Sequence, residues 1–164
     1  MRIEKERYYL EIAKAVALRS PCIRRKYGAI IVKNDSIVST GYNGPARGST
    51  NCEIGCAKEI LNLPHYSAYD YCPAVHAEEN AIANAARNGS SVLEGILYLY
   101  GVDAKTNKPV AGMPCSRCKR LLINSGIKDG LGKIKKLMKK WLAKYWKSKT
   151  VLIFQINWNY SEPW

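Results

Sequence analysis

The strongest constraint on the fold of this 164-residue chain comes from two short segments, HAE at 76–78 and PCSRC at 114–118. Each stands at the start of a predicted helix, the first over 76–88 and the second over 114–126. A short apolar run at 95–101 lies between them and predicts a buried strand. Because a strand separates the two helices, both helix N-termini can meet at the same end of a sheet.

The remaining segments predict a three-layer α/β/α sandwich with a mixed central sheet. Apolar residues at helical spacing predict a helix over 4–19. Residues 28–44 predict a β-hairpin with its turn at Asn34 and Asp35. A loop-rich stretch follows over 45–74. The order helix, hairpin, helix, strand, helix predicts that the later strands of the sheet run parallel.

The two constraining segments bring together residue types that bind zinc. His76 offers an imidazole, and Cys115 and Cys118 lie three residues apart in a first helical turn, so both thiols face one way. Three protein ligands leave a fourth position for water, which is typical of a catalytic zinc site. Glu78 lies two residues after His76, and we expect it to move protons between this water and a substrate without binding the metal.

A simpler interpretation is a structural Cys-x-x-Cys pair with an unrelated histidine in the core. Two features favour the catalytic interpretation. A glutamate follows the histidine by two residues, and Pro114 directly precedes the first cysteine. A purely structural site has no need of Glu78.

At these residues the chain resembles the zinc-dependent cytidine deaminase superfamily, and within it the deoxycytidylate (dCMP) deaminase family. Further motifs carry the resemblance over residues 4–127, namely RSPCIRRKYGAIIV at 19–32, STGYNGPARG at 39–48, NCEIGC at 51–56 and ARNGSSVLEGILYLYG at 86–101. The resemblance implies the cytidine deaminase-like fold, deamination of dCMP to dUMP for thymidylate synthesis, and a homo-oligomer that is often allosteric. It also implies zinc held by His76, Cys115 and Cys118, with Glu78 as the proton shuttle.

The same resemblance suggests residues that contact the substrate. Asn43, in the GYNG segment, is expected against the sugar or base of the nucleotide, although an asparagine here is also typical of a turn. Arg87 is assigned to an effector site, a subunit contact or simply the C-terminal end of its helix. The basic residues offered for the phosphate are Lys26 and Arg47, with Arg24 and Arg25 as neighbours, and each alone is also typical of a solvated surface charge.

Four cysteines lie outside the catalytic pair, namely Cys22, Cys52, Cys56 and Cys72. Some dCMP deaminases carry a second, non-catalytic zinc near these segments. The resemblance therefore implies a structural zinc site here, in which His65 can replace one thiol. Such a site would pin the long loop to the end of the first helix. The alternative is that these are ordinary buried thiols.

Composition changes abruptly near residue 128. Residues 128–164 hold nine lysines against two acidic residues, more than half of the net charge of +13, and all four tryptophans. A basic amphipathic helix over 133–147 and a strand over 151–158 are predicted, whereas the family usually continues directly into a strand. We therefore divide the chain into a deaminase domain at 1–127 and an atypical C-terminal segment. This segment is a variant that completes the domain, a basic appendage for nucleic acid or an anionic membrane, or an aberrant sequence such as a shifted reading frame.

The chain has no apolar run long enough to span a membrane and no secretory signal at its N-terminus. These features favour a cytoplasmic protein with reduced cysteines. We predict dCMP deamination, with a nucleotide rather than nucleic acid as the partner. Two alternatives stay open: a deaminase of another cytosine compound or of a tRNA base, and a catalytically silent zinc protein that binds nucleic acid through its basic tail.

Overall fold

The computed structural model describes residues 2–64 and 68–128 of the chain. Its helices are α1 (Lys5–Ala17), α2 (Ala57–Ile60), α3 (Ala77–Arg87) and α4 (Ser116–Asn124), and its strands are β1 (Arg25–Lys33), β2 (Ser36–Tyr42), β3 (Gly44–Pro45), β4 (Ala74–Val75), β5 (Ile96–Asp103) and β6 (Pro109–Val110). The helices predicted over 4–19, 76–88 and 114–126 are confirmed as α1, α3 and α4. The helix predicted over 133–147, the strand over 151–158 and His65 lie outside the described residues.

The main sheet has four strands in the order β2-β1-β5-β6. β1 pairs antiparallel with β2 and β5, and β5 pairs antiparallel with β6. The expectation that later strands run parallel is wrong for these four strands, because the chain after β5 turns back directly to form β6. In the described part of the chain, a parallel contact is formed by one isolated bridge between Ile96 and Lys128. It lies where the chain returns from α4 to the side of β5.

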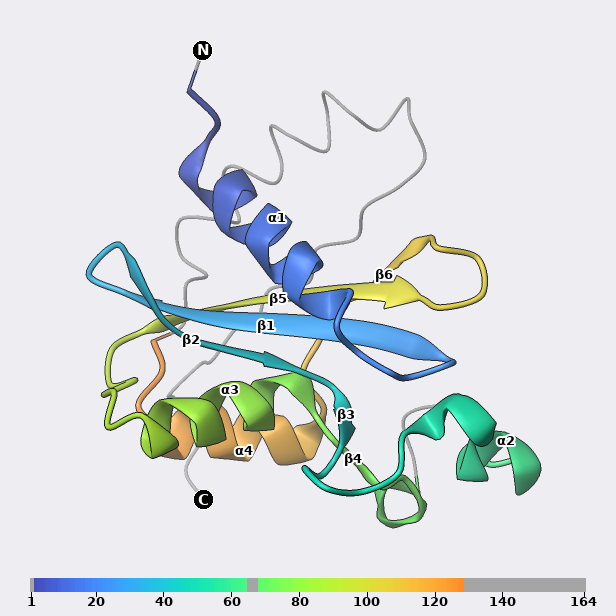
Figure 1. Ribbon diagram of the computed structural model, residues 1–164. Coiled ribbons are helices and arrows are strands. Elements are labelled where there is room, and N and C mark those ends of the chain that lie inside the picture. The colour runs from blue at the N-terminus through green and yellow to red at the C-terminus, as the bar shows by residue number, and fades with distance from the viewer. Residues whose placement is uncertain (1, 65–67, 129–164) are drawn as a thin grey trace.

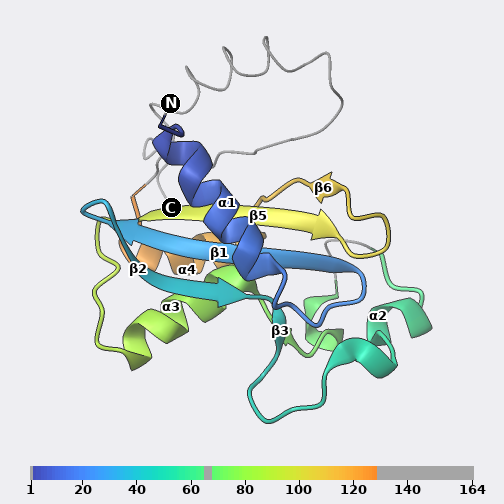
Figure 2. The same ribbon diagram turned by 45° about the horizontal axis from the view of Figure 1, so that its top comes forward.

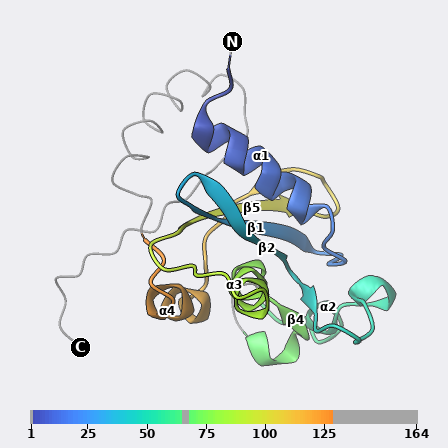
Figure 3. The same cartoon turned by 60° about the vertical axis from the view of Figure 1, so that its left-hand side comes forward.

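Helices cover both faces of this sheet, as predicted (Figure 1). Residues of β1 alternate between the two faces, so neighbouring residues belong to different cores. On one face α1 lies across β1 and β5 (Figure 2), and its core residues are Tyr9, Ala13, Ile30, Val32 and Tyr98. On the other face α3 and α4 lie side by side (Figure 3), and Ala77 and Ala81 of α3 meet Ala29 and Ile31.

Glycines allow two helices to approach the sheet closely. A Cβ atom added to Gly28 in β1 would lie 2.2 Å from the carbonyl oxygen of Ala13 and 2.3 Å from the nitrogen of Ala17, both in the α1 backbone. A Cβ atom added to Gly41 in β2 would lie 2.3 Å from the nitrogen of Ala81 in α3. The three-layer arrangement therefore depends on the absence of side chains at these two positions.

Side chains of α3 bind the outer edge of β2. Asn80 and Asn84 donate hydrogen bonds to the carbonyls of Tyr42 and Thr40, at 2.7 and 2.8 Å. The Ser39 hydroxyl donates in turn to the carbonyl of Ala81 at 2.6 Å. An edge strand otherwise presents unpaired backbone groups, so these bonds both protect the edge and fix the position of α3.

The hairpin between β1 and β2 turns at Asn34 and Asp35, as predicted. Both residues have positive φ, 49° and 62°, and Lys33 pairs with Ser36, which describes a two-residue turn. The buried Tyr9 of α1 donates its hydroxyl toward the Asp35 carbonyl and carboxylate, at 2.9 and 2.7 Å. The turn is thereby attached to α1.

We expect Tyr9→Phe to lower the free energy of unfolding by about 1 kcal/mol, because it removes this hydroxyl but keeps the buried ring. Hydrogen bonds from Lys5 and Tyr9 lower the pKa of Asp35. Because the pKa of Asp35 is lower in the folded than in the unfolded protein, its carboxylate stabilises the fold at any pH above the unfolded-state pKa. This stabilisation is lost as the pH falls through the folded-state pKa. Urea unfolding should therefore show a smaller difference in the free energy of unfolding between the wild-type protein and Tyr9→Phe at pH 3 than at pH 7. Tyr8→Phe, at a 48% exposed position on the same helix, is the matched control, and an equal loss there would contradict the prediction.

No helix in the described residues has the length and apolar character needed to cross a lipid bilayer.

Candidate active site

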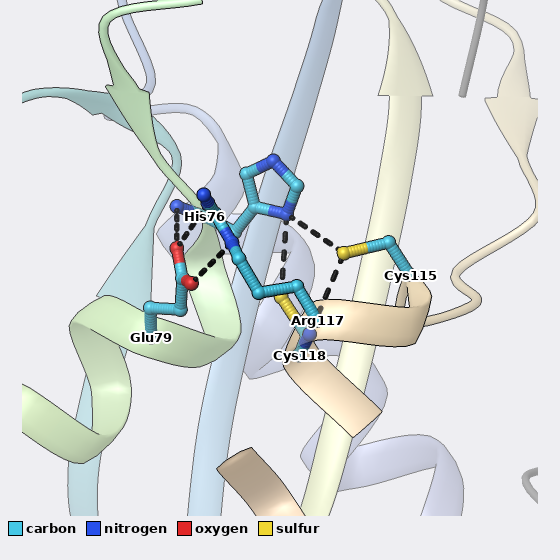
Figure 4. A network of polar contacts seen from close by, with 5 residues as sticks. All are labelled: His76, Glu79, Cys115, Arg117 and Cys118. Atoms are coloured by element: carbon cyan, nitrogen blue, oxygen red, sulfur yellow. Dashed lines mark hydrogen bonds and ion pairs between the residues drawn. The ribbon is translucent and has the colours of Figure 1, made fainter. Parts of the chain in front are cut away.

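Three ligating side chains meet where α3 and α4 begin (Figure 4). His76 is the residue that caps the N-terminus of α3, and Cys115 occupies the same position on α4. The His76 Nδ1 atom lies 3.6 Å from the Cys115 Sγ atom and 3.2 Å from the Cys118 Sγ atom. The prediction that the two helix N-termini bring these residues together is confirmed.

Local structure explains why each ligand stands where it does. His76 directly follows β4, which pairs with β3 in a small second sheet at the end of the hairpin. Cys115 accepts a hydrogen bond from the backbone N–H of Cys118, at 3.5 Å, and so replaces the usual side-chain oxygen at a helix start. The start of α4 directs the positive end of its dipole toward the two thiols, whereas burial, followed by the charge of Glu78, raises the pKa of Cys118. A bound metal ion would offset this cost and hold the sulfurs as thiolates.

This donor set fits zinc. The ligand atoms of His76, Cys115 and Cys118 all lie within 4.8 Å of one another, and no other group of three or more histidine, cysteine or acidic side chains meets this criterion among the described residues. Zinc accepts imidazole nitrogen and thiolate sulfur in a tetrahedron, in which two such ligand atoms lie about 3.5 Å apart. Burial lowers the pKa of His76, which keeps its imidazole neutral and able to bind a metal.

Glu78 lies in the first turn of α3 and is buried, with 5% of its surface exposed. Burial raises the pKa of its carboxyl to about 7, and hydrogen bonds from its own backbone and from the Cys118 side chain partly oppose this change. Both the protonated and the ionised form are therefore accessible near neutral pH. This is the property that a group needs to accept a proton and release it again.

A cavity of about 330 Å³ opens beside this group. His76, Glu78 and Cys115 form one part of its wall. The residues of the wall that bear on substrate or metal binding are Asn43, the cations Arg24, Arg25 and Lys58, the aromatic side chains Tyr69 and Tyr71, and the cysteines Cys22, Cys52, Cys56 and Cys72. The cavity is large enough for a nucleotide-sized ligand.

Asn43 lines this cavity, but most of its amide is used to hold the fold. Its Oδ1 atom accepts from the Ser20 hydroxyl at 2.8 Å and from the backbone N–H of Tyr27 at 2.6 Å. Its Nδ2 atom donates to the carbonyl of Arg25 at 2.9 Å. A primary amide has two N–H donors, and the second is not used in these bonds.

The basic residues preferred from the sequence are placed elsewhere. Lys26 does not line the cavity, whereas its strand neighbours Arg25 and Tyr27 do. Arg47 donates to the side chain of Asn84 at 2.7 Å and is not part of the cavity wall. Arg87 is exposed in the last turn of α3. The roles assigned to these residues stay predictions.

The four remaining cysteines are gathered by the fold, although they are separated by up to 50 residues in the chain. All four line the cavity, and each is partly buried. Burial raises the pKa of Cys52, and the neighbouring thiols Cys22, Cys72 and Cys56 raise it further. Their sulfur atoms do not converge as closely as the His76 group does. His65, the alternative ligand, lies outside the described residues.

Four residues of the site were not predicted. Lys58 is 7% exposed, and its Nζ atom lies 5.3 Å from the centre of the Tyr69 ring, which in turn meets the His76 ring edge-on at 5.3 Å. Glu79 and Arg117 form an ion pair across the starts of α3 and α4. A local signal existed for Glu79, which directly follows the HAE segment, and for Arg117, which lies inside PCSRC. Nothing local distinguishes Lys58 or Tyr69 within the loop.

A histidine and two cysteines at two helix starts, with a buried glutamate beside them and an α/β/α sandwich around them, define a zinc-dependent deaminase. Residues 3–131 match the family described as cytidine and deoxycytidylate deaminase zinc-binding region. The chain belongs to this family.

Individual relatives agree with this assignment. The chain is 34% identical over 125 residues to the deoxycytidylate deaminase of Schizosaccharomyces pombe, a match that covers 74% of this chain but 34% of that protein. It is 35% identical over 131 residues to the deoxycytidylate deaminase of Mycobacterium phage D29, covering 77% and 91% of the two chains. The crystal structure of dCMP deaminase from cyanophage S-TIM5 in complex with dCMP and dUMP superimposes with a TM-score of 0.56 at 28% identity, over 78% and 79% of the two chains.

Proposed function

We propose that this chain catalyses the hydrolytic deamination of dCMP to dUMP and ammonia, which supplies the thymidylate pathway. The observation that carries the proposal is the buried Glu78 carboxyl beside a His-Cys-Cys donor set at the wall of an open cavity. The relatives named deoxycytidylate deaminase, and the cyanophage enzyme bound to dCMP and dUMP, support dCMP as the cytosine compound.

In the proposed reaction His76, Cys115 and Cys118 hold zinc, which when bound supplies a Lewis acid and lowers the pKa of water. Deamination adds a water oxygen to C4 of the cytosine ring, breaks the bond between C4 and the exocyclic amino nitrogen, and releases that nitrogen as ammonia. Glu78 takes a proton from the water and gives it to ring nitrogen N3, and it then transfers the second proton to the leaving amine. The carboxyl ends in the form in which it began.

We propose that the phosphate is recognised by the cations of the cavity wall, Arg24, Arg25 and Lys58. Lys58 is the most deeply buried of the lysines described, and a cation of low exposure binds an anion more strongly than one in water. The Tyr69 ring contacts Lys58 and His76, so it separates Lys58 from the metal centre by the width of one aromatic ring. The remaining N–H of Asn43 is proposed to contact the sugar or base.

This reaction and this phosphate site are tested by comparing dCMP with deoxycytidine through the absorbance change from cytosine to uracil. We expect kcat/KM for dCMP to exceed that for deoxycytidine, and Lys58→Met to lower the dCMP value about 10- to 100-fold while changing the deoxycytidine value little. Lys26→Met is the matched control and also tests the residue preferred from the sequence. Equal rates on both substrates in the wild-type protein would overturn dCMP as the substrate.

We propose that Cys22, Cys52, Cys56 and Cys72 hold a second, structural zinc that ties the loop to the end of α1, with His65 as a substitute ligand. All four line the same cavity, and the other three thiols act on the pKa of Cys52, which supports this proposal. Metal analysis of the purified full-length chain should then give two zinc ions per chain. Cys52→Ser should give one and lower the melting temperature, and Cys118→Ser should also give one but without turnover. A single zinc in the wild-type protein would rule out the second site.

We further propose that the protein works in the cytoplasm as a homo-oligomer. The proposal requires the six cysteines to be reduced, the state that zinc binding needs and that a reducing compartment maintains. The oligomer rests on the family resemblance, with the exposed Arg87 as a candidate subunit or effector contact. Sedimentation velocity of the full chain tests whether it forms an oligomer. The same measurement on Arg87→Ala tests whether this residue contributes to the subunit contact.

A further inference from the structure

Glu79 and Arg117 join the two helix starts through a paired contact (Figure 4). The Arg117 Nε atom lies 2.9 Å from Glu79 Oε1, and the Arg117 Nη2 atom donates to Glu79 Oε2 at 3.0 Å. Two parallel bonds between a guanidinium and a carboxylate fix orientation as well as distance. The contact therefore defines the spacing between α3 and α4 at one point.

That point is the metal centre, because each partner is attached to a ligand. Glu79 Oε2 also accepts the backbone N–H of His76 at 3.0 Å. Arg117 lies between Cys115 and Cys118 in the first turn of α4. A single carboxylate thus connects the backbone of the histidine ligand to the helix that carries both cysteine ligands.

An aromatic ring completes the connection. The guanidinium carbon of Arg117 lies 6.0 Å from the centre of the Tyr69 ring, and this ring meets the His76 ring edge-on at 5.3 Å. Arg117 therefore reaches His76 by two routes, through Glu79 to its backbone and through Tyr69 to its side chain. A shift of Arg117 would be transmitted to the imidazole.

We propose that the Glu79–Arg117 pair is a positioning device that holds the histidine and cysteine halves of the metal centre at the spacing zinc requires and so slows the loss of zinc. The inference rests on the proposed role of His76, Cys115 and Cys118 as zinc ligands. The pair is partly exposed, with 44% of the Arg117 side chain and 17% of the Glu79 side chain accessible. Exposed ion pairs contribute little to global stability, so the effect belongs to metal retention rather than to folding.

The test is the rate of zinc release from the holoprotein into excess 4-(2-pyridylazo)resorcinol, followed by absorbance. Because two zinc sites are proposed, release is expected in two kinetic phases. The phase that is absent when Cys118→Ser is measured is assigned to the centre of His76, Cys115 and Cys118. We expect Arg117→Gln and Glu79→Gln each to accelerate this phase about 10-fold. The double variant should be no faster than either single variant, because both remove the same contact. Arg120→Gln removes one positive charge from an exposed position on the same helix and should release zinc at the wild-type rate.

Circular dichroism and melting temperature are measured on every variant, so that a folding defect is recognised. Wild-type release rates in both single variants would overturn the inference, even if their melting temperatures fell. Acceleration by Arg120→Gln equal to that by Arg117→Gln would also overturn it, since loss of charge alone would then suffice. A wild-type protein that retains zinc but does not deaminate dCMP would overturn the proposed function and leave this comparison intact.

Discussion

Glu78→Gln is expected to reduce kcat for dCMP deamination roughly a thousand-fold while zinc stays bound. A general acid–base group contributes about 10²- to 10⁴-fold, and this carboxyl is asked to move both protons of the reaction. Glutamine keeps the shape and the burial of the side chain but cannot accept or release a proton. Single-turnover kinetics with zinc-loaded protein, combined with metal analysis, measure the two quantities separately.

The matched control is Glu11→Gln, a change of the same kind at an exposed position of α1 on the opposite face of the sheet. It should leave kcat unchanged. Retention of more than about a tenth of wild-type kcat by Glu78→Gln would contradict the proton-transfer role. A loss of zinc along with activity would instead mean that Glu78 acts through the stability of the metal centre.

Gly28→Ala is expected to lower the free energy of unfolding by about 3 kcal/mol, which corresponds to a melting temperature about 10 °C lower. The new methyl group would lie 2.2 Å from the Ala13 carbonyl oxygen and 2.3 Å from the Ala17 nitrogen. Both atoms belong to a helix backbone, so relief requires α1 to move away from the core around Tyr9 and Ile30. Thermal unfolding by circular dichroism measures the change.

Gly48→Ala is the control that distinguishes the steric overlap at Gly28 from the energetic cost of placing a side chain on a strained backbone. Gly48 has φ of +83°, and an added Cβ would meet no atom within 4 Å. Its substitution should cost about 1 kcal/mol from conformation alone. If Gly48→Ala destabilised the protein as much as Gly28→Ala does, close approach of α1 would not be the reason for the glycine in β1.

Periodicity and local chemistry predicted the main elements well. The helix expected over 76–88 is Ala77–Arg87 in the structure, and the turn at Asn34 and Asp35 lies where expected. These features depend on interactions between residues close in sequence. The return of β6 next to β5 was missed because Pro109–Val110 is only two residues long and carries no alternation of its own.

The site shows the same division. His76, Glu78, Cys115 and Cys118 could be found from spacing, since each pair lies within one helical turn and the two helix starts need only one strand between them. The cations of the cavity could not be chosen in this way. Arg25 lines the cavity while its neighbour Lys26 does not, because alternate residues of an extended strand face opposite sides.

The sequence by itself determined which atoms are available for chemistry: an imidazole, two thiols and a carboxyl at two helix starts. The tertiary structure decided what surrounds them, namely the Glu79–Arg117 contact, Tyr69 between Lys58 and His76, and four cysteines, distant in the chain, that line the same cavity. The physical reason is the separation along the sequence of the residues that interact. Spacing within a helical turn is set by local backbone geometry, whereas contacts across 20 or more residues depend on how complete layers pack.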